Sequence, residues 1–104
     1  MLQLMWAHRG GAIRRKSPHV RPTVSNMKFG MLYELQLPKP WDEGAEHRLI
    51  KEATEQIVLA DKLGIDHAWA VEHHFLEEYS HCSASDVFLA SLAAKTERIR
   101  IGLG

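Results

Sequence analysis

Two amphipathic, helix-length segments separate three short apolar runs in this chain, and that order constrains the fold more than any other feature. The apolar runs cover Lys28–Leu35, Asp66–Val71 and Arg98–Leu103. Their length and composition are typical of buried strands. A connection that contains a helix joins parallel strands, because antiparallel neighbours need only a short turn. The sequence therefore predicts an α/β fold with β-α-β-α-β order and a parallel sheet.

The two predicted helices carry start and stop signals. The first opens at Asp42–Glu46, where acids favour the positive end of the helix dipole, and ends at Gly64 as a C-terminal cap. The second is predicted to start within Ser83–Asp86, which has the Ser-x-x-Asp form of a helix start, and to continue to about Thr96. The apolar face of the first helix comprises Leu49, Ala53, Ile57, Ala60 and Leu63.

Such a sheet needs cover on both faces or closure into a barrel. Right-handed crossovers that run in one direction place both helices on the same side of the sheet. We therefore expect one sheet face to be open, with apolar side chains on it.

Residues 1–26 differ from the rest of the chain. They contain five basic and no acidic residues, with Gly10-Gly11, Pro18 and Pro22, and no sustained helical or strand period. We expect a disordered basic extension ahead of a domain at 27–104. The simplest interpretation is a start codon assigned too far upstream, with the natural beginning at Met27; a basic tail is the alternative.

Charge and cysteine content exclude several classes of protein. Residues 27–104 carry eight basic against thirteen acidic side chains, a net charge of −5, which gives no basis for nucleic-acid binding. Cys82 is the only cysteine, so an intrachain disulfide is impossible and a reducing cytoplasm is the expected location. No apolar run approaches the roughly 20 residues of a membrane helix, so we expect no membrane association.

The segment Glu72-His73-His74-Phe75 follows the second predicted strand directly. Parallel α/β folds carry their chemistry at the carboxyl ends of strands. A histidine there, beside a carboxylate, can act as a general acid or base. Since adjacent strand residues face opposite ways, only one of the two histidines can point into a barrel mouth while the other packs toward the helices.

Two other interpretations of these residues stay open on composition alone. His67, His81 and Cys82 lie close to the segment, and imidazole suits zinc, iron or nickel, but no His-x-x-x-His or Cys-x-x-Cys spacing is present, so we assign no metal site. Histidines that are only solvated or hydrogen-bonded in a loop would give the same sequence pattern.

The wider pattern resembles the bacterial luciferase-like flavin-dependent monooxygenases over residues 27–104. The most specific part is Glu-His-His-Phe after an apolar strand that follows a Leu-Gly-Ile-Asp turn. The matching segments are Met27-Lys28-Phe29-Gly30, Leu63-Gly64-Ile65-Asp66, Val71-Glu72-His73-His74-Phe75 and Arg98-Ile99-Arg100-Ile101-Gly102.

This resemblance implies the N-terminal β-α-β-α-β portion of a (β/α)8 TIM barrel that binds reduced FMN, or in some branches a deazaflavin, at the mouth of the strands. His73 matches the catalytic, proton-transferring histidine, and Glu72 and His74 would lie beside the cofactor. Leu32 and Glu34 have the strand parity expected for cofactor-binding positions at the barrel mouth. Trp69 and Phe75 are predicted to be packing residues.

The implied reaction oxidises an organic substrate with molecular oxygen, and a flavin reductase would supply the reduced flavin. Three strands of eight are present, and the groups that hold a flavin phosphate typically come late in a barrel, so we expect the isolated chain to be inactive. The alternatives are a non-catalytic remnant that associates through its open sheet, as a homo- or hetero-oligomer, and a small metal-binding protein.

Overall fold

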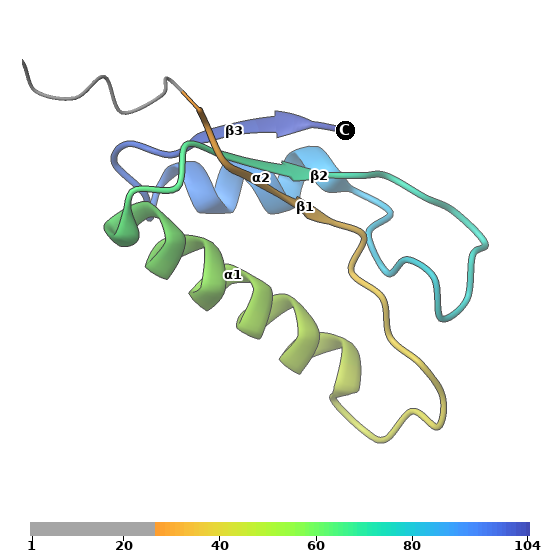
Figure 1. The fold of residues 1–104 in the computed structure, drawn as a ribbon. Coiled ribbons are helices and arrows are strands. Elements are labelled where there is room, and N and C mark those ends of the chain that lie inside the picture. The colour runs from red at the N-terminus through yellow and green to blue at the C-terminus, as the bar shows by residue number, and fades with distance from the viewer. Residues whose placement is uncertain (1–26) are drawn as a thin grey trace, which may run out of the picture.

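The structure, a computed structural model, describes residues 27–104 of the 104-residue chain. The extension expected over residues 1–26 lies outside the described residues, and the domain boundary at Met27 stays a prediction. The elements follow the predicted order along the chain (Figure 1). They are β1 (Gly30–Tyr33), α1 (Ala45–Leu63), β2 (His67–Ala70), α2 (Ser85–Ala93) and β3 (Arg100–Leu103).

The three strands form one parallel sheet in the order β1-β2-β3. Leu32 pairs with Trp69, and Trp69 pairs with Gly102, so these three positions share one face of the sheet. The parallel α/β fold predicted from the order of apolar runs and helices is confirmed.

Both helices cover the same face of this sheet (Figure 1). Ala68 and Ala70 of β2 point toward them and are fully buried, whereas Leu32 on the opposite face is 58% exposed. The core between sheet and helices comprises Ala53, Ile57 and Ala60 of α1 and Phe88, Leu89 and Leu92 of α2, with Leu35, Cys82 and Ile99 at its edges. The expectation of one open face is therefore confirmed.

Glycines define both ends of α1. Gly44 precedes the helix with a φ of 77°, and Gly64 follows it with a φ of 89°, where its amide donates to the carbonyls of Ala60 and Asp61. The predicted cap at Gly64 is confirmed, because a left-handed residue is what ends a helix in this way. The helix begins at Ala45, directly after the left-handed Gly44 and within the predicted opening at Asp42–Glu46.

Helix α2 starts within the predicted segment Ser83–Asp86, but its predicted end is wrong. The helix begins at Ser85 after Ala84, and no side chain caps it, so Ser83 does not act as the expected cap. It ends at Ala93 rather than near Thr96, and the amide of Lys95 donates to the carbonyl of Leu92 in a tight turn.

Asp61 of α1 explains where the chain leaves this turn. Its carboxylate accepts hydrogen bonds from the amides of Glu97, Arg98 and Ile99 at 2.9, 2.9 and 2.7 Å. These amides, with that of Glu97 contributing most, lower the pKa of the Asp61 carboxyl. Since the three amides are engaged by a side chain, β3 begins at Arg100 and not at the predicted Arg98.

The open face of the sheet carries an indole that lies flat between glycines. The Trp69 ring stacks on the His67 ring with centroids 5.0 Å apart and planes within 5°. A Cβ atom added at Gly30 would lie 2.2 Å from the Trp69 ring, and one at Gly102 would lie 3.1 Å from it. Trp69 therefore packs on the open face and not in the core between sheet and helices.

Phe75 does not pack at all in this structure. It is fully exposed and adopts a φ of 61°, so its prediction as a packing residue is wrong. No helix among residues 27–104 is both long and apolar enough to cross a membrane.

Candidate active site

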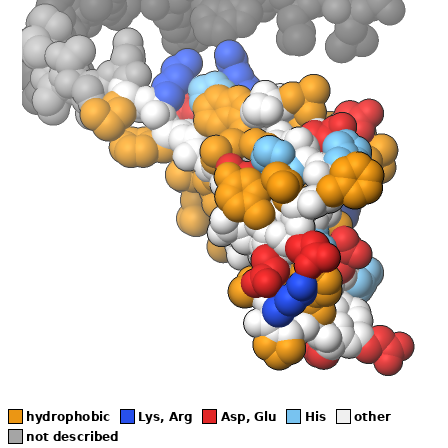
Figure 2. Space-filling view, turned by 90° about the vertical axis from the view of Figure 1, so that its right-hand side faces the viewer, with side chains coloured by type: hydrophobic (Ala, Val, Ile, Leu, Met, Phe, Trp, Pro, Cys, Tyr) orange, Lys and Arg blue, Asp and Glu red, His pale blue; other side chains and the backbone are white. Residues whose placement is uncertain are grey.

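The segments after β1 and β2 meet at the end of the molecule toward which the strands point. Figure 2 looks onto this end: histidine side chains lie among hydrophobic ones, and acidic side chains gather below them with few basic ones. The two basic residues near this end, Lys39 and Arg48, pair with Glu77 and Asp42 respectively. The predicted site residues all lie on or near this end.

His73 and Glu34 form the first pair of this site. Both extend the strand parity that includes Leu32 and Trp69, so they continue the open sheet face beyond the ends of β1 and β2. His73 Nε2 lies 3.6 Å from Glu34 Oε2, and about a third of each side chain or less is exposed. The His73 ring also lies edge-on to Tyr79, with centroids 5.5 Å apart.

Leu32 lies directly below this pair on the same face. A Cβ atom placed at Gly104 would lie 3.1 Å from the Leu32 side chain and 3.2 Å from that of Val71, so these two side chains border the same glycine. The arrangement gives an apolar surface next to a polar pair.

Glu72 and His74 form a second pair on the other side of the chain. His74 Nε2 lies 3.1 Å from Glu72 Oε1, and the Ser85 hydroxyl donates to Glu72 Oε2 at 3.0 Å. The contact with His74 first, and those with Ser85 next, lower the pKa of the Glu72 carboxyl. Glu72 thereby ties the segment after β2 to the first turn of α2, where a negative charge is favourable.

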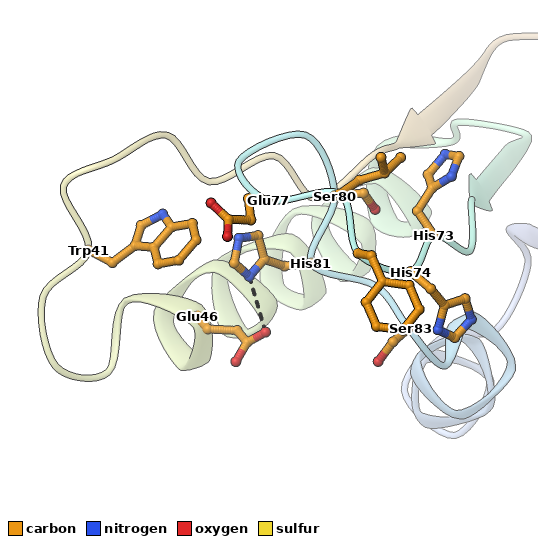
Figure 3. A pocket seen from close by; sticks show the side chains of 10 residues that line it. Trp41, Glu46, His73, His74, Glu77, Ser80, His81 and Ser83 are labelled. Atoms are coloured by element: carbon orange, nitrogen blue, oxygen red, sulfur yellow. Dashed lines mark hydrogen bonds and ion pairs between the residues drawn. The ribbon is translucent and has the colours of Figure 1, made fainter.

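The two histidines therefore have different partners, as strand alternation predicts. Figure 3 shows their rings pointing in opposite directions, His73 away from Ser83 and His74 toward it. His73 meets a carboxylate from β1's extension, whereas His74 meets one from its own segment next to α2. Only the His73 pair faces the open side of the sheet.

An open cleft of about 320 Å³ lies between the two segments and includes His73 and His74 in its lining. Trp41, Glu46 and His81 gather at its other end (Figure 3). His81 Nδ1 lies 3.2 Å from Glu46 Oε1, and its ring is edge-on to Trp41 at 5.1 Å. This pair joins the first turn of α1 to the segment before α2.

Sequence reasoning did not find the partners that hold these groups. Ser85 was interpreted only as part of a helix start, Glu46 only as a helix acid, and Tyr79 was not singled out. Their contacts join residues that are far apart in the chain or lie in an irregular loop, where no periodic pattern gives a signal. In residues 27–104 no group of three His, Cys, Asp or Glu side chains is arranged to hold a metal ion.

The chain also matches a known family. The profile of the luciferase-like monooxygenases covers residues 27–104, which is well over half of the chain. The chain belongs to the luciferase-like monooxygenase family. The chain is also similar to the protein YwcH of Bacillus subtilis (strain 168), described as uncharacterised, with 35% identity over 66 residues that make up 62% of this chain and 20% of YwcH.

Two solved structures are similar to this luciferase-like chain. Apo-MsnO8 matches with a TM-score of 0.63 and 26% identity over 73% of this chain and 22% of its own. The second is a type II Baeyer-Villiger monooxygenase, the oxygenating constituent of 3,6-diketocamphane monooxygenase from the CAM plasmid of Pseudomonas putida, in complex with FMN. It matches with a TM-score of 0.64 and 18% identity over 74% of this chain and 20% of its own.

These similarities confirm the fold class: the described residues form a β-α-β-α-β portion of a TIM barrel of the luciferase-like type. The chain spans about a fifth of the length of the curated relative and of both solved structures.

Proposed function

We propose that residues 27–104 supply the proton-transferring histidine, His73, of a flavin-dependent monooxygenase. One observation carries this proposal: His73 lies beside Glu34 at the carboxyl end of the parallel sheet and on its open face. That is where barrel enzymes hold their catalytic residues. Family membership supports monooxygenase chemistry, and the FMN of the diketocamphane monooxygenase structure supports FMN as the cofactor, with a deazaflavin as the alternative.

The described residues fit the ring of a flavin better than its phosphate. Leu32 and Val71 offer apolar surface, and Glu34 Oε2 is buried without a hydrogen-bond partner in the described part of the chain. A flavin ring has an apolar face and polar edges, which matches this combination. Lys39 and Arg48 are already paired with acids, so we assign the phosphate to no residue here.

Bound reduced flavin would supply the electrons for oxygen reduction and substrate oxidation. In this proposal His73 holds or delivers a proton next to the ring, and Leu32 helps to exclude water. Glu72 and His74 remain predicted cofactor-binding residues, but their contacts with Ser85 and with each other favour an indirect contribution, in which they fix the segment that carries His73.

The partners in this proposal are an organic substrate, molecular oxygen and a flavin reductase, in the cytoplasm. The 104-residue chain by itself is proposed to lack monooxygenase turnover, because the described residues form three strands of a barrel and the groups that hold a flavin phosphate typically come late in a barrel. An oxygen electrode with reduced FMN tests this, and oxygen uptake that depends on the 104-residue chain would contradict it.

The role of His73 is tested in a chimera in which the matching segment of the oxygenating constituent of 3,6-diketocamphane monooxygenase is replaced by that of this chain. We expect His73→Ala in the chimera to slow flavin-dependent oxygen consumption on the order of 100-fold, because general acid-base groups contribute rate enhancements of that order. The Kd for FMN should stay within about tenfold, since the residue acts in the chemical step.

His47→Ala is the matched control, because His47 is exposed on α1 and should leave both quantities unchanged. Equal rates for the parent chimera and His73→Ala would remove His73 from the mechanism.

A further inference from the structure

We propose that Glu34 is the positioning residue of His73: its carboxylate holds a proton on Nε2 and leaves Nδ1 as the nitrogen that exchanges protons. The inference rests on the proposed function for the reaction that His73 serves. The pairing itself concerns two side chains of this chain and can be measured without flavin. It also changes the predicted role of Glu34 from contacting the cofactor to orienting the residue that does.

The first support is an oxygen atom without a partner. Glu34 Oε2 is buried from solvent and accepts no hydrogen bond from the described residues. His73 Nε2 lies 3.6 Å from this oxygen, slightly beyond a normal hydrogen bond. Leaving a carboxylate oxygen buried and unpaired is costly, and catalytic hydrogen bonds often tighten only when a site is filled. A small movement of either side chain would satisfy this oxygen with the Nε2 proton.

The second support is that the backbone fixes both residues against the same segment. Leu35, next to Glu34, has a buried side chain and a φ of 53°, and its carbonyl accepts the amide of His81 at 3.0 Å. The amide of His73 donates to the carbonyl of Cys82 at 2.9 Å. Residues 81 and 82 therefore hold the two partners at a set separation, which is what preorganised positioning requires.

The third support is that each of the two histidines has a carboxylate of its own. His74 has its own carboxylate, Glu72, on the opposite side of the chain, so Glu72 is not available to His73. The Tyr79 ring also lies against His73, in an edge arrangement with ring centroids 5.5 Å apart. Among the described residues Glu34 is therefore the one carboxylate that meets the His73 ring.

The Glu34 carboxylate determines which tautomer the His73 ring adopts. A carboxylate only accepts hydrogen bonds, so the ring nitrogen that faces it must carry the proton. In a neutral imidazole the other nitrogen then has the free lone pair. Nδ1 makes no hydrogen bond within the described residues and belongs to a side chain that is about one third exposed, so it can meet a ligand.

The experiment is nitrogen-15 NMR of the full 104-residue chain, without flavin, using long-range correlations of the histidine rings. His73→Gln assigns the His73 signals. We expect the neutral His73 ring to carry its proton on Nε2. A proton on Nδ1 in the unmodified chain would overturn the inference without the need for any variant.

Glu34→Gln is the decisive variant, since it keeps the shape of the side chain and removes the charge. We expect the tautomer ratio of the neutral His73 ring to change, while Glu34→Asp keeps part of the effect. Glu72→Gln is the matched control and should move the His74 signals but leave those of His73 in place.

Unchanged His73 signals in Glu34→Gln would overturn the inference. This measurement contains no flavin, so it is separate from the turnover assay. If Glu34→Gln leaves the His73 signals unchanged while His73→Ala abolishes turnover, the pairing is refuted and the proposed function stands.

Discussion

Three carboxylates of this chain each contact a different kind of group. Asp61 binds the amides that start β3, Glu72 links the segment after β2 to α2, and Glu34 faces His73. The sequence indicated acids near a histidine pair and a helix end, but it could not assign these partners. The amides that Asp61 binds lie 36 to 38 residues away, and no local pattern encodes a contact at that separation.

Asp61 gives the residue-scale prediction. Its carboxyl pKa is lowered in the folded chain, so the stability it contributes is fully present above its ordinary pKa, near 4. That stability is lost as the pH falls through the lower folded value. We therefore expect Asp61→Asn to lower the urea midpoint at pH 7, and to weaken the fall in stability that acid causes in the unmodified chain.

The measurement compares urea midpoints at pH 7 and near pH 3 for both proteins. Glu52→Gln, at an exposed position of α1, is the matched control and should behave like the unmodified chain. The same acid-induced change in Asp61→Asn as in the unmodified chain would count against this role.

At the scale of elements, the helical period predicted most of the buried face of α1. Ala53, Ile57 and Ala60 are buried as expected, but Leu63 from the same predicted face is 74% exposed. Its position in the last turn explains this, because the chain leaves the helix at Gly64 and the sheet ends beside it. The start of β3 was not predicted correctly because tertiary contacts from Asp61 to the amides of Glu97 and Arg98, and not local signals, decide where that strand begins.

The core of α2 gives the element-scale prediction. Leu92 is fully buried between α2 and the sheet. We expect Leu92→Ala to lower the free energy of unfolding by about 2–5 kcal/mol, because it removes buried methyl groups and leaves a cavity. Leu63→Ala is the matched control at an exposed helical position, with an expected change of about 0.5 kcal/mol or less.

Urea denaturation followed by circular dichroism measures both changes. Equal losses in the two variants would show that Leu92 does not occupy the core described above.

At the scale of the whole molecule, the order of elements was enough to predict the parallel sheet, the common side of the two helices and the open face. The structure adds what occupies that face: Leu32, Val71 and the Trp69 ring between Gly30 and Gly102. The sequence placed His73 at the carboxyl end of the second strand and, by strand parity, Glu34 at the barrel mouth. Their pairing could not be predicted, since it depends on how the segment around His81 joins the two strand ends.

The open face predicts association. An apolar sheet face with exposed Leu32 and Trp69 is unfavourable in water, so we expect the 104-residue chain to self-associate as its concentration rises. Leu32→Lys should reduce this association. Val87→Lys, which alters an exposed apolar residue on the helical side, should not.

Size-exclusion chromatography with light scattering measures the mass of each protein. A monodisperse monomer at all concentrations would refute association through the open face.

The central claim is that the open face at the carboxyl end of the strands, with His73 and Glu34, is the side that meets the flavin. The most direct measurement is a crystal structure, with FMN bound, of the chimera that carries this segment in the diketocamphane monooxygenase constituent. We expect the flavin ring to lie against the Leu32 side of the sheet with its edge toward His73. A flavin ring on the Glu72 and His74 side, or away from His73, would contradict it.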